Sequence, residues 1–257
     1  MFKRIFLAGA ALALTAGAAS ADTFSLNYEA PGVQNTTATL SVMGVETFDS
    51  VPTGYNAPFT TDFGTAGAIT GTYSGPNGVQ INAADQYGGA GGAGHYAVAF
   101  GSTPYSVSLT SNPSLDPEGV NYFGYWLSAL DRGNVVTFYR GGAQVGQLTP
   151  GQVSSTVSGN PAYYGNPNAN FLGQDSGEPF VFVNFYDKTG TFNRVTFTED
   201  PAVGGYESDN HTVGFYTAQG GVPEPAAWTL MLVGFGALGL ALRDRRRLFG
   251  ETQAHEI

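Results

Sequence analysis

The sequence lacks cysteine altogether, and it has few basic residues away from its two ends. Without cysteine there are no disulfides, thiol nucleophiles, thiolate zinc sites or iron–sulfur clusters. Between Asp22 and Val222, sixteen acidic residues accompany only four basic ones, which are Arg132, Arg140, Lys188 and Arg194. An acidic chain of this kind repels phosphates, so nucleic-acid binding driven by counterion release is excluded. The charge suits a protein outside the cell, or one that binds divalent cations.

Histidine is also rare, since only His95 and His211 precede the C-terminal segment that contains His255. A histidine-based hydrolase needs one of them beside a nucleophile and an orienting acid. No Gly-x-Ser-x-Gly element is present to supply that nucleophile. We therefore expect both histidines to be hydrogen-bonded loop residues, and we expect the protein not to be an enzyme.

The N-terminal residues 1–21 have the three parts of a secretory signal. Lys3 and Arg4 provide a positive start, and Ile5–Ala18 is an apolar stretch. The small residues 19–21 (Ala-Ser-Ala) supply the recognition site that a signal peptidase requires. The apolar run is short for a permanent membrane anchor. The sequence thus predicts a signal peptide over 1–21 that is cleaved before Asp22.

The body of the chain, residues 22–217, is rich in Gly, Ser, Thr, Asn, Tyr and Phe and poor in Leu, Lys and Glu. This composition disfavours helices and favours strands. Turn signals recur about every ten residues, a spacing typical of sandwiches. We expect an all-β fold, with the body forming a single β-sandwich or jelly-roll domain. The only helical turn that we expect lies near 83–87.

Several segments of the body can be assigned more closely. Residues 135–139 and 144–148 flank a glycine-containing loop and predict a hairpin. Residues 180–186 and 192–198 predict a second hairpin, with the first of these strands inside a sheet because it is apolar on both faces. Residues 213–217 are expected to form the last strand.

The C-terminal region changes composition. Residues 218–222 are small and polar and predict a linker, after which Pro223, Glu224 and Pro225 precede an uncharged segment over 226–242. As a helix this segment would rise roughly 25 Å, near the lower limit for crossing a bilayer. Trp228 lies at its outer end, and its inner end carries four arginines, Arg243, Arg245, Arg246 and Arg247. We expect one short transmembrane helix, with the body outside the inner membrane and residues 248–257 as a cytoplasmic tail.

The tripeptide, the tryptophan, the Gly234-Phe235-Gly236 element and the arginine cluster together resemble the PEP-CTERM sorting signal, over 223–247. The resemblance implies that a membrane-embedded exosortase recognises the tripeptide and cleaves near it. It further implies that the product is released or passed to the surface of a bacterium that makes exopolysaccharide. Asp244 and the residues after Arg247 depart from the usual pattern.

The body is also similar to a group of exosortase-dependent surface proteins, in segments 45–49, 85–96, 122–131 and 205–213. This resemblance brings no activity with it. We expect a non-enzymatic surface or matrix protein that is associated with the exopolysaccharide or biofilm layer. It would be anchored transiently in the inner membrane and then reach the cell surface or the medium. The alternatives are a carbohydrate-binding module and a secreted hydrolase.

Acidic residues near the first and last strands predict a structural calcium site. Glu46 and Asp49 lie near one end of the body, and Asp209 and Asn210 lie near the other. If the two strands are neighbours, four side-chain oxygens converge, and backbone carbonyls and water complete the six to eight ligands of calcium. A hydrogen-bonded acid–amide cluster fits the same residues.

Two aromatic groups suggest glycan binding. Tyr163 and Tyr164 lie in a predicted loop, where binding residues are common. The aromatic run over 122–126 can also stack on sugars, although one face of such a strand is usually in the core. The hydrolase alternative instead requires a pocket that holds two carboxyls. Three pairs are close in sequence, namely Asp116/Glu118, Asp175/Glu178 and Glu207/Asp209, and we expect them to be solvated turn residues.

Glycines 89, 91 and 94 match the spacing of a dinucleotide-binding loop. That function needs the pattern between a strand and a helix, whereas the flanks here are polar and no helix is predicted after it. We expect a tight loop whose residues adopt positive φ.

Overall fold

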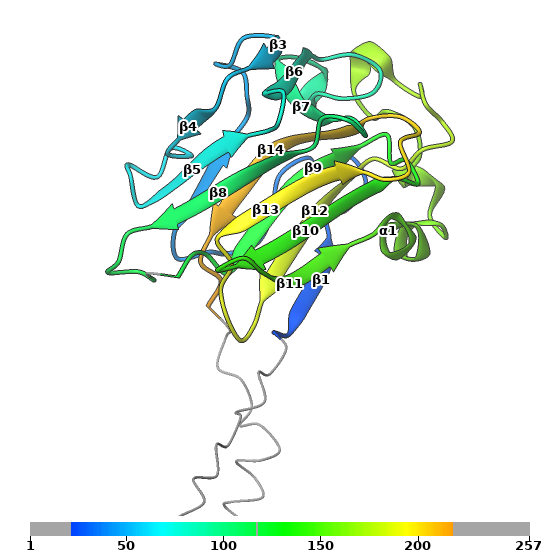
Figure 1. Ribbon diagram of the computed structural model, residues 1–257. Coiled ribbons are helices and arrows are strands. Elements are labelled where there is room, and N and C mark those ends of the chain that lie inside the picture. Colours follow the sequence, from blue (N-terminus) through cyan, green and yellow to red (C-terminus); the bar gives the residue numbers. More distant parts are fainter. Residues whose placement is uncertain (1–21, 117, 218–257) are drawn as a thin grey trace, which may run out of the picture. The chain divides into compact units, whose positions relative to one another are not determined.

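The computed structural model describes residues 22–116 and 118–217, which fold into two antiparallel sheets (Figure 1). The larger sheet has eight strands, seven of which are hydrogen-bonded to one another in a continuous order. The order is β1 (Phe24–Tyr28), β12 (Val181–Asp187), β9 (Tyr122–Ser128), β14 (Tyr206–Gly214), β7 (His95–Ala99), β6 (Val79–Ala83) and β3 (Gly54–Asn56). The further strand, β2 (Met43–Glu46), also pairs with β14.

The smaller sheet has six strands. Their order is β11 (Ala143–Leu148), β10 (Asn134–Arg140), β13 (Arg194–Glu199), β8 (Tyr105–Ser111), β5 (Ile69–Ser74) and β4 (Phe59–Thr61). Helix is limited, in the described residues, to α1 (Pro150–Val157) and to the 3₁₀ turns η1 (Ala90–Gly92), η2 (Pro161–Tyr163) and η3 (Ala169–Phe171). The expectation of an all-β fold is confirmed for this part of the chain.

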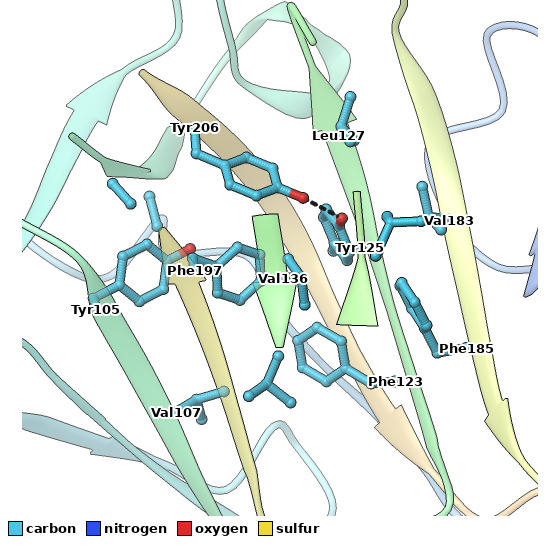
Figure 2. Close-up of a cluster of buried hydrophobic side chains, with 14 of the residues drawn as sticks. Tyr105, Val107, Phe123, Tyr125, Leu127, Val136, Val183, Phe185, Phe197 and Tyr206 are labelled. Carbon is cyan, nitrogen blue, oxygen red and sulfur yellow. Dashed lines mark hydrogen bonds between the residues drawn. The ribbon is translucent and has the colours of Figure 1, made fainter. Parts of the chain in front are cut away.

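The core lies between the two sheets and follows from strand alternation. In β8, Tyr105, Val107 and Leu109 are buried, whereas the residues between them point outward. Their neighbours in the core are aromatic side chains from both sheets: Tyr105 stacks on Phe197 of β13, with ring centroids 4.9 Å apart. Figure 2 shows this cluster, in which the hydroxyls of Tyr125 and Tyr206 are hydrogen-bonded. Burial of each such side chain contributes about 1.5–3 kcal/mol to folding.

A second layer covers part of the outer face of the larger sheet. Trp126 and Phe182 point away from the main core and form a separate buried cluster with Ala129 and Phe180, and Ala90 of η1 packs against it. The covering loops are tied together, because Asn166 Nδ2 donates to the carbonyl of Gln86 at 2.9 Å. This layer explains why β9 and β12 are apolar on both faces.

The predicted strand connections are partly correct. β10 and β11 form the predicted antiparallel hairpin. The second predicted hairpin is wrong, because β12 belongs to the larger sheet and β13 to the smaller one. Between them, Asp187 Oδ1 accepts hydrogen bonds from the backbone N–H groups of Thr189 and Gly190, and the chain crosses from one sheet to the other.

Two further expectations about elements need correction. The last strand begins at Tyr206, not at residue 213, so polar residues assigned to a turn lie inside it. The helix α1 was not predicted. It begins with a capping box in which Thr149 and Gln152 exchange hydrogen bonds, and a proline occupies its first turn.

No helix in residues 22–116 and 118–217 is long and apolar enough to cross a membrane. The predicted transmembrane segment 226–242, the linker 218–222, the tripeptide, the arginine cluster and the tail 248–257 lie outside the described residues, as does the signal peptide over 1–21. The expectations about the structure of these segments stay predictions from the sequence.

His211 is a core residue, so the expectation that it lies in a loop is wrong. It is fully buried between the sheets and stacks on Phe197, with ring centroids 4.9 Å apart and planes 12° apart. Its Nδ1 lies 3.0 Å from the hydroxyl of Tyr73, and its Nε2 has no partner. Burial lowers the pKa of His211 from 6.5 to about 3. The ring is therefore neutral at physiological pH.

Replacing His211 tests this assignment through acid stability. Because the folded-state pKa lies below the unfolded one, the stability that the neutral ring confers is present above pH 6.5 and is lost as the pH falls towards 3. Between about pH 7 and pH 5, the unfolding free energy of the wild type should fall by about 2 kcal/mol relative to that of His211→Phe. Urea unfolding of both full chains in detergent measures the two unfolding free energies. If they depend on pH in the same way, the assignment is contradicted.

Candidate functional site

The central strand β14 organises the polar groups of the larger sheet. Tyr206 and Ser208 point into the core, and so do His211 and Val213, three and five residues after Ser208. The break in alternation is a bulge at Asn210, which has a left-handed φ of 48° and interrupts the register with β9. On its other side β14 changes partner, from β7 before the bulge to β2 after it. The bulge leaves Asp209 on the outer face.

Asp209 is almost fully enclosed. Its Oδ2 accepts a hydrogen bond from Ala90 N at 2.7 Å, and its Oδ1 accepts one from Asn210 N at 2.6 Å. Asn210 Nδ2 in turn donates to the carbonyl of Gln34 and to Asn35 Oδ1. The pKa of Asp209 is raised to about 8. Burial is the largest cause, the charges of Asp49 and Glu46 add to it, and the two N–H donors act in the opposite direction.

The structure brings together most of the predicted calcium ligands. Asp49, Asp209 and Asn210 line one hollow of about 210 Å³. Glu46 is the neighbour of His211 across the β2–β14 pair, and its Oε1 accepts from Phe48 N at 2.7 Å. Asp49 Oδ1 accepts from His95 N at 2.9 Å, beside Gly94, where a Cβ would collide with the carboxylate. The expected juxtaposition of the two strands is thus present.

The contacts in this hollow match the alternative arrangement, a hydrogen-bonded acid–amide cluster. Backbone N–H groups already occupy one oxygen each of Glu46 and Asp49 and both oxygens of Asp209. Among the described residues, no group of three or more histidine or acidic side chains is arranged to hold a metal ion. Gly89, Gly91 and Gly94 nearby all have positive φ, as a tight loop requires.

The aromatic residues proposed for glycan stacking serve packing. Tyr163 and Tyr164 are half-buried against the main core, and the Tyr163 hydroxyl donates to the carbonyl of Glu29 at 2.9 Å. In β9 every side chain is buried, including Trp126 under the second layer. Tyr163 and Tyr164 keep part of their surface exposed, whereas the side chains of β9 do not.

A second hollow, of about 570 Å³, was not predicted. Four carboxyls line it, and we call it the acidic pocket. Its carboxyls come from separate segments: Asp85 follows β6, Asp131 precedes β10, Glu178 precedes β12 and Glu207 lies on β14. The remaining lining residues are aromatic, apolar, amide or glycine, namely Asn82, Tyr87, Tyr96, Phe100, Ala129, Val203, Gly204 and Gly205.

Local contacts shape the acidic pocket. The hydroxyl of Tyr96 donates to Asp85 Oδ1 at 2.9 Å. A Cβ at Gly204 would collide with the carboxylate of Asp131, and a Cβ at Gly205 would collide with that of Glu207. Just behind them, Glu199 Oε1 accepts from the N–H groups of Val203 and Gly204, which fixes this turn. The two glycines therefore make room for two of the four carboxyls.

The carboxyls of the acidic pocket affect one another. Burial raises the pKa of Glu207 well above its usual range, and the charges of Asp131, Glu199 and Asp85 add to this. Burial also raises the pKa of Glu178, and the charge of Asp131 raises it further. Glu178 and Glu207 are thus harder to ionise, first because they are buried and second because other carboxylates are close.

Of the carboxyl pairs close in sequence, Glu207 and Asp209 line different hollows. The acidic pocket takes Glu178 and Glu207, one member from each of two pairs, whereas Asp209 lines the hollow beside Asp49. The expectation of solvated turn residues is wrong for Glu207 and Asp209, since both are buried in β14. Asp116 and Glu118 lie together in another hollow, beside Arg140 and Lys188.

A family model for the PEP-CTERM protein-sorting motif matches residues 221–247. The chain is a PEP-CTERM sorting-signal protein. The match ends at Arg247, the last arginine of the predicted signal, and begins two residues before Pro223. No curated protein and no solved structure is significantly similar to the chain.

The motif indicates how this PEP-CTERM protein is sorted and processed. It is an exported protein that is anchored transiently in the membrane and processed by an exosortase. The described residues 22–116 and 118–217 all precede the motif, and both hollows lie within them.

The acid–amide cluster predicts a specific response to mutation and to chelation. Asp209→Ala removes the acceptor of two buried N–H groups and should lower the unfolding free energy by about 1–3 kcal/mol. Addition of EDTA should leave the thermal midpoint of the full-length PEP-CTERM protein unchanged, because backbone N–H groups already occupy both oxygens of Asp209.

The control is Asp62→Ala, which removes an exposed carboxylate that caps Gly64 N at 3.0 Å and should cost less than about 0.5 kcal/mol. Calorimetric unfolding measures both. A fall of the midpoint with EDTA, restored by calcium, would instead establish the calcium site.

Proposed function

We propose that this protein is an exopolysaccharide-associated surface protein, which exosortase releases from its anchor and which acts without catalysis. The observation that carries the proposal is the sorting motif at 221–247. A transient anchor delivers the body to the outer side of the inner membrane, and cleavage near Pro223–Pro225 frees it for the cell surface. The polysaccharide layer is the partner that the resemblance to PEP-CTERM proteins implies at that location.

The described residues support a non-catalytic role through their histidines. His211 is enclosed between the sheets, so no substrate reaches it. His95 begins β7, and its Nδ1 lies 2.9 Å from the carbonyl of Val51, a structural contact. Neither histidine activates a serine nucleophile, which is the arrangement that a serine hydrolase requires.

Processing by the exosortase can be tested with the tripeptide. Replacing Pro223, Glu224 and Pro225 by alanine should abolish cleavage, so that the full-length protein accumulates in the membrane fraction and the released form disappears. The matched control, Gln219→Ala in the predicted linker, should be processed like the wild type. Cell fractionation followed by immunoblotting measures both. Normal release of the triple variant would exclude recognition through the tripeptide.

Association with the polysaccharide is a separate test. The released protein should co-sediment with the extracellular matrix of its own bacterium, and enzymatic digestion of the polysaccharide should bring it into the soluble fraction. A strain that makes no exopolysaccharide should lose the protein to the medium. Equal retention in both strains would contradict the proposal.

A secreted glycoside hydrolase is the second candidate, and the acidic pocket is the observation that favours it. Such enzymes place two carboxyls across one cleft, with the pKa of the general acid raised. Glu178 and Glu207 share a pocket, and burial raises the pKa of both. Release of reducing ends from the exopolysaccharide, abolished in Glu207→Gln, would establish catalysis and refute the non-enzymatic proposal.

A further inference from the structure

In the described part of the chain, the buried Glu207 carboxyl of β14 receives a hydrogen bond only from its own backbone N–H. Glu207 is 7 % exposed, and it lines the acidic pocket. Among the residues that the structure describes, none donates a hydrogen bond to this carboxyl from its own backbone or side chain, apart from Glu207 itself. Ser128, its neighbour across the β14–β9 pair, has a buried Oγ that is also unpartnered. A buried carboxyl with so few donors is costly, and a ligand that brings further donors reduces that cost.

The charge of the lining narrows the class of ligand. Asp85, Asp131, Glu178 and Glu207 face the same pocket, and no lysine, arginine or histidine lines it. An anionic ligand is therefore repelled, whereas a cationic group relieves the mutual repulsion of the carboxyls. A bare metal ion is disfavoured, because no described group of three or more acidic or histidine side chains has the arrangement that holds one.

The aromatic lining adds a surface for a ring. Tyr87 is 46 % exposed in the loop after β6, so its ring is open to a ligand, unlike the half-buried rings of Tyr163 and Tyr164. An aromatic face can pack against the apolar face of a sugar and can attract an ammonium group. The volume of about 570 Å³ is typical of small-molecule sites.

We propose that the acidic pocket binds an amino-sugar unit that carries a free ammonium group. The carboxyls accept hydrogen bonds from the ammonium and hydroxyl groups, Glu207 being the innermost acceptor, and Tyr87 packs on the sugar ring. A fully N-acetylated sugar lacks the positive charge and leaves the carboxyls uncompensated. This inference rests on the proposed association with exopolysaccharide and names the chemical group that is recognised.

Titration calorimetry with two probes tests the proposal on the full chain in detergent. The probes are a β-1,4-linked glucosamine tetrasaccharide and the same tetrasaccharide fully N-acetylated. The glucosamine form should bind at least about tenfold more tightly, and its binding should weaken as salt is added, since charge attraction contributes to it.

Three variants locate the binding. Glu207→Gln keeps the shape of the side chain and removes its charge, and it should weaken glucosamine binding about tenfold. Tyr87→Ala changes an exposed loop residue outside the strands, so folding is preserved, and it should also weaken binding. Glu118→Gln makes the same charge change at an exposed position lining a different hollow, and it should bind like the wild type.

Other outcomes overturn the proposal. Equal affinity for the two tetrasaccharides removes the role of the ammonium group. Equal loss in Glu118→Gln and Glu207→Gln assigns binding to the overall negative charge. Calcium binding that Glu207→Gln abolishes, without saccharide binding, replaces the sugar by a metal. Co-sedimentation with the matrix but no tetrasaccharide binding refutes the pocket assignment alone, whereas tetrasaccharide binding without co-sedimentation refutes the proposed function alone.

Discussion

The burial of β14 on both faces is the constraint on which the rest of the structure depends. All nine of its residues are buried, although six of them in succession are polar. Each buried polar group must find a partner. Ser208 meets the hydroxyl of Tyr105 at 2.6 Å, His211 meets Tyr73, and Asp209 meets the loop that begins η1. These contacts join the strand to the opposite sheet on one side and to the covering layer on the other.

The bulge at Asn210 lets one strand serve both sides. Without the extra residue, strict alternation from Ser208 would turn Asn210 into the core and His211 outward. The left-handed φ of Asn210 instead keeps its side-chain amide out of the core, and the amide donates hydrogen bonds to Gln34 and Asn35. His211 then enters an aromatic environment that keeps it neutral. The Glu207 carboxyl, in contrast to that of Asp209, receives no donor from another described residue in this arrangement.

How much of this could be read from the sequence depends on how local each signal is. The apolar run of β12 and the glycine loop between β10 and β11 are local signals, and they predicted strands correctly. The polar run of β14 resembles a turn, because the loops that bury it come from residues far away in the chain. The capping box of α1 is a local signal too: Thr149, Pro150 and Gln152 could have revealed the helix.

The sorting motif and the acidic pocket also differ in how local their sequence signals are. An exosortase reads a sorting motif as a linear segment, so its residues are recognisable without the fold. The acidic pocket needs carboxyls from four segments, held in place by Gly204 and Gly205 and by a second layer over the sheet. Nearness in sequence was misleading here: Glu207 and Asp209 share one face of β14, yet they line different hollows. Asp209 accepts from two backbone N–H groups, whereas Glu207, within the described residues, accepts only from its own, so Glu207 is the carboxyl that we propose contacts a ligand.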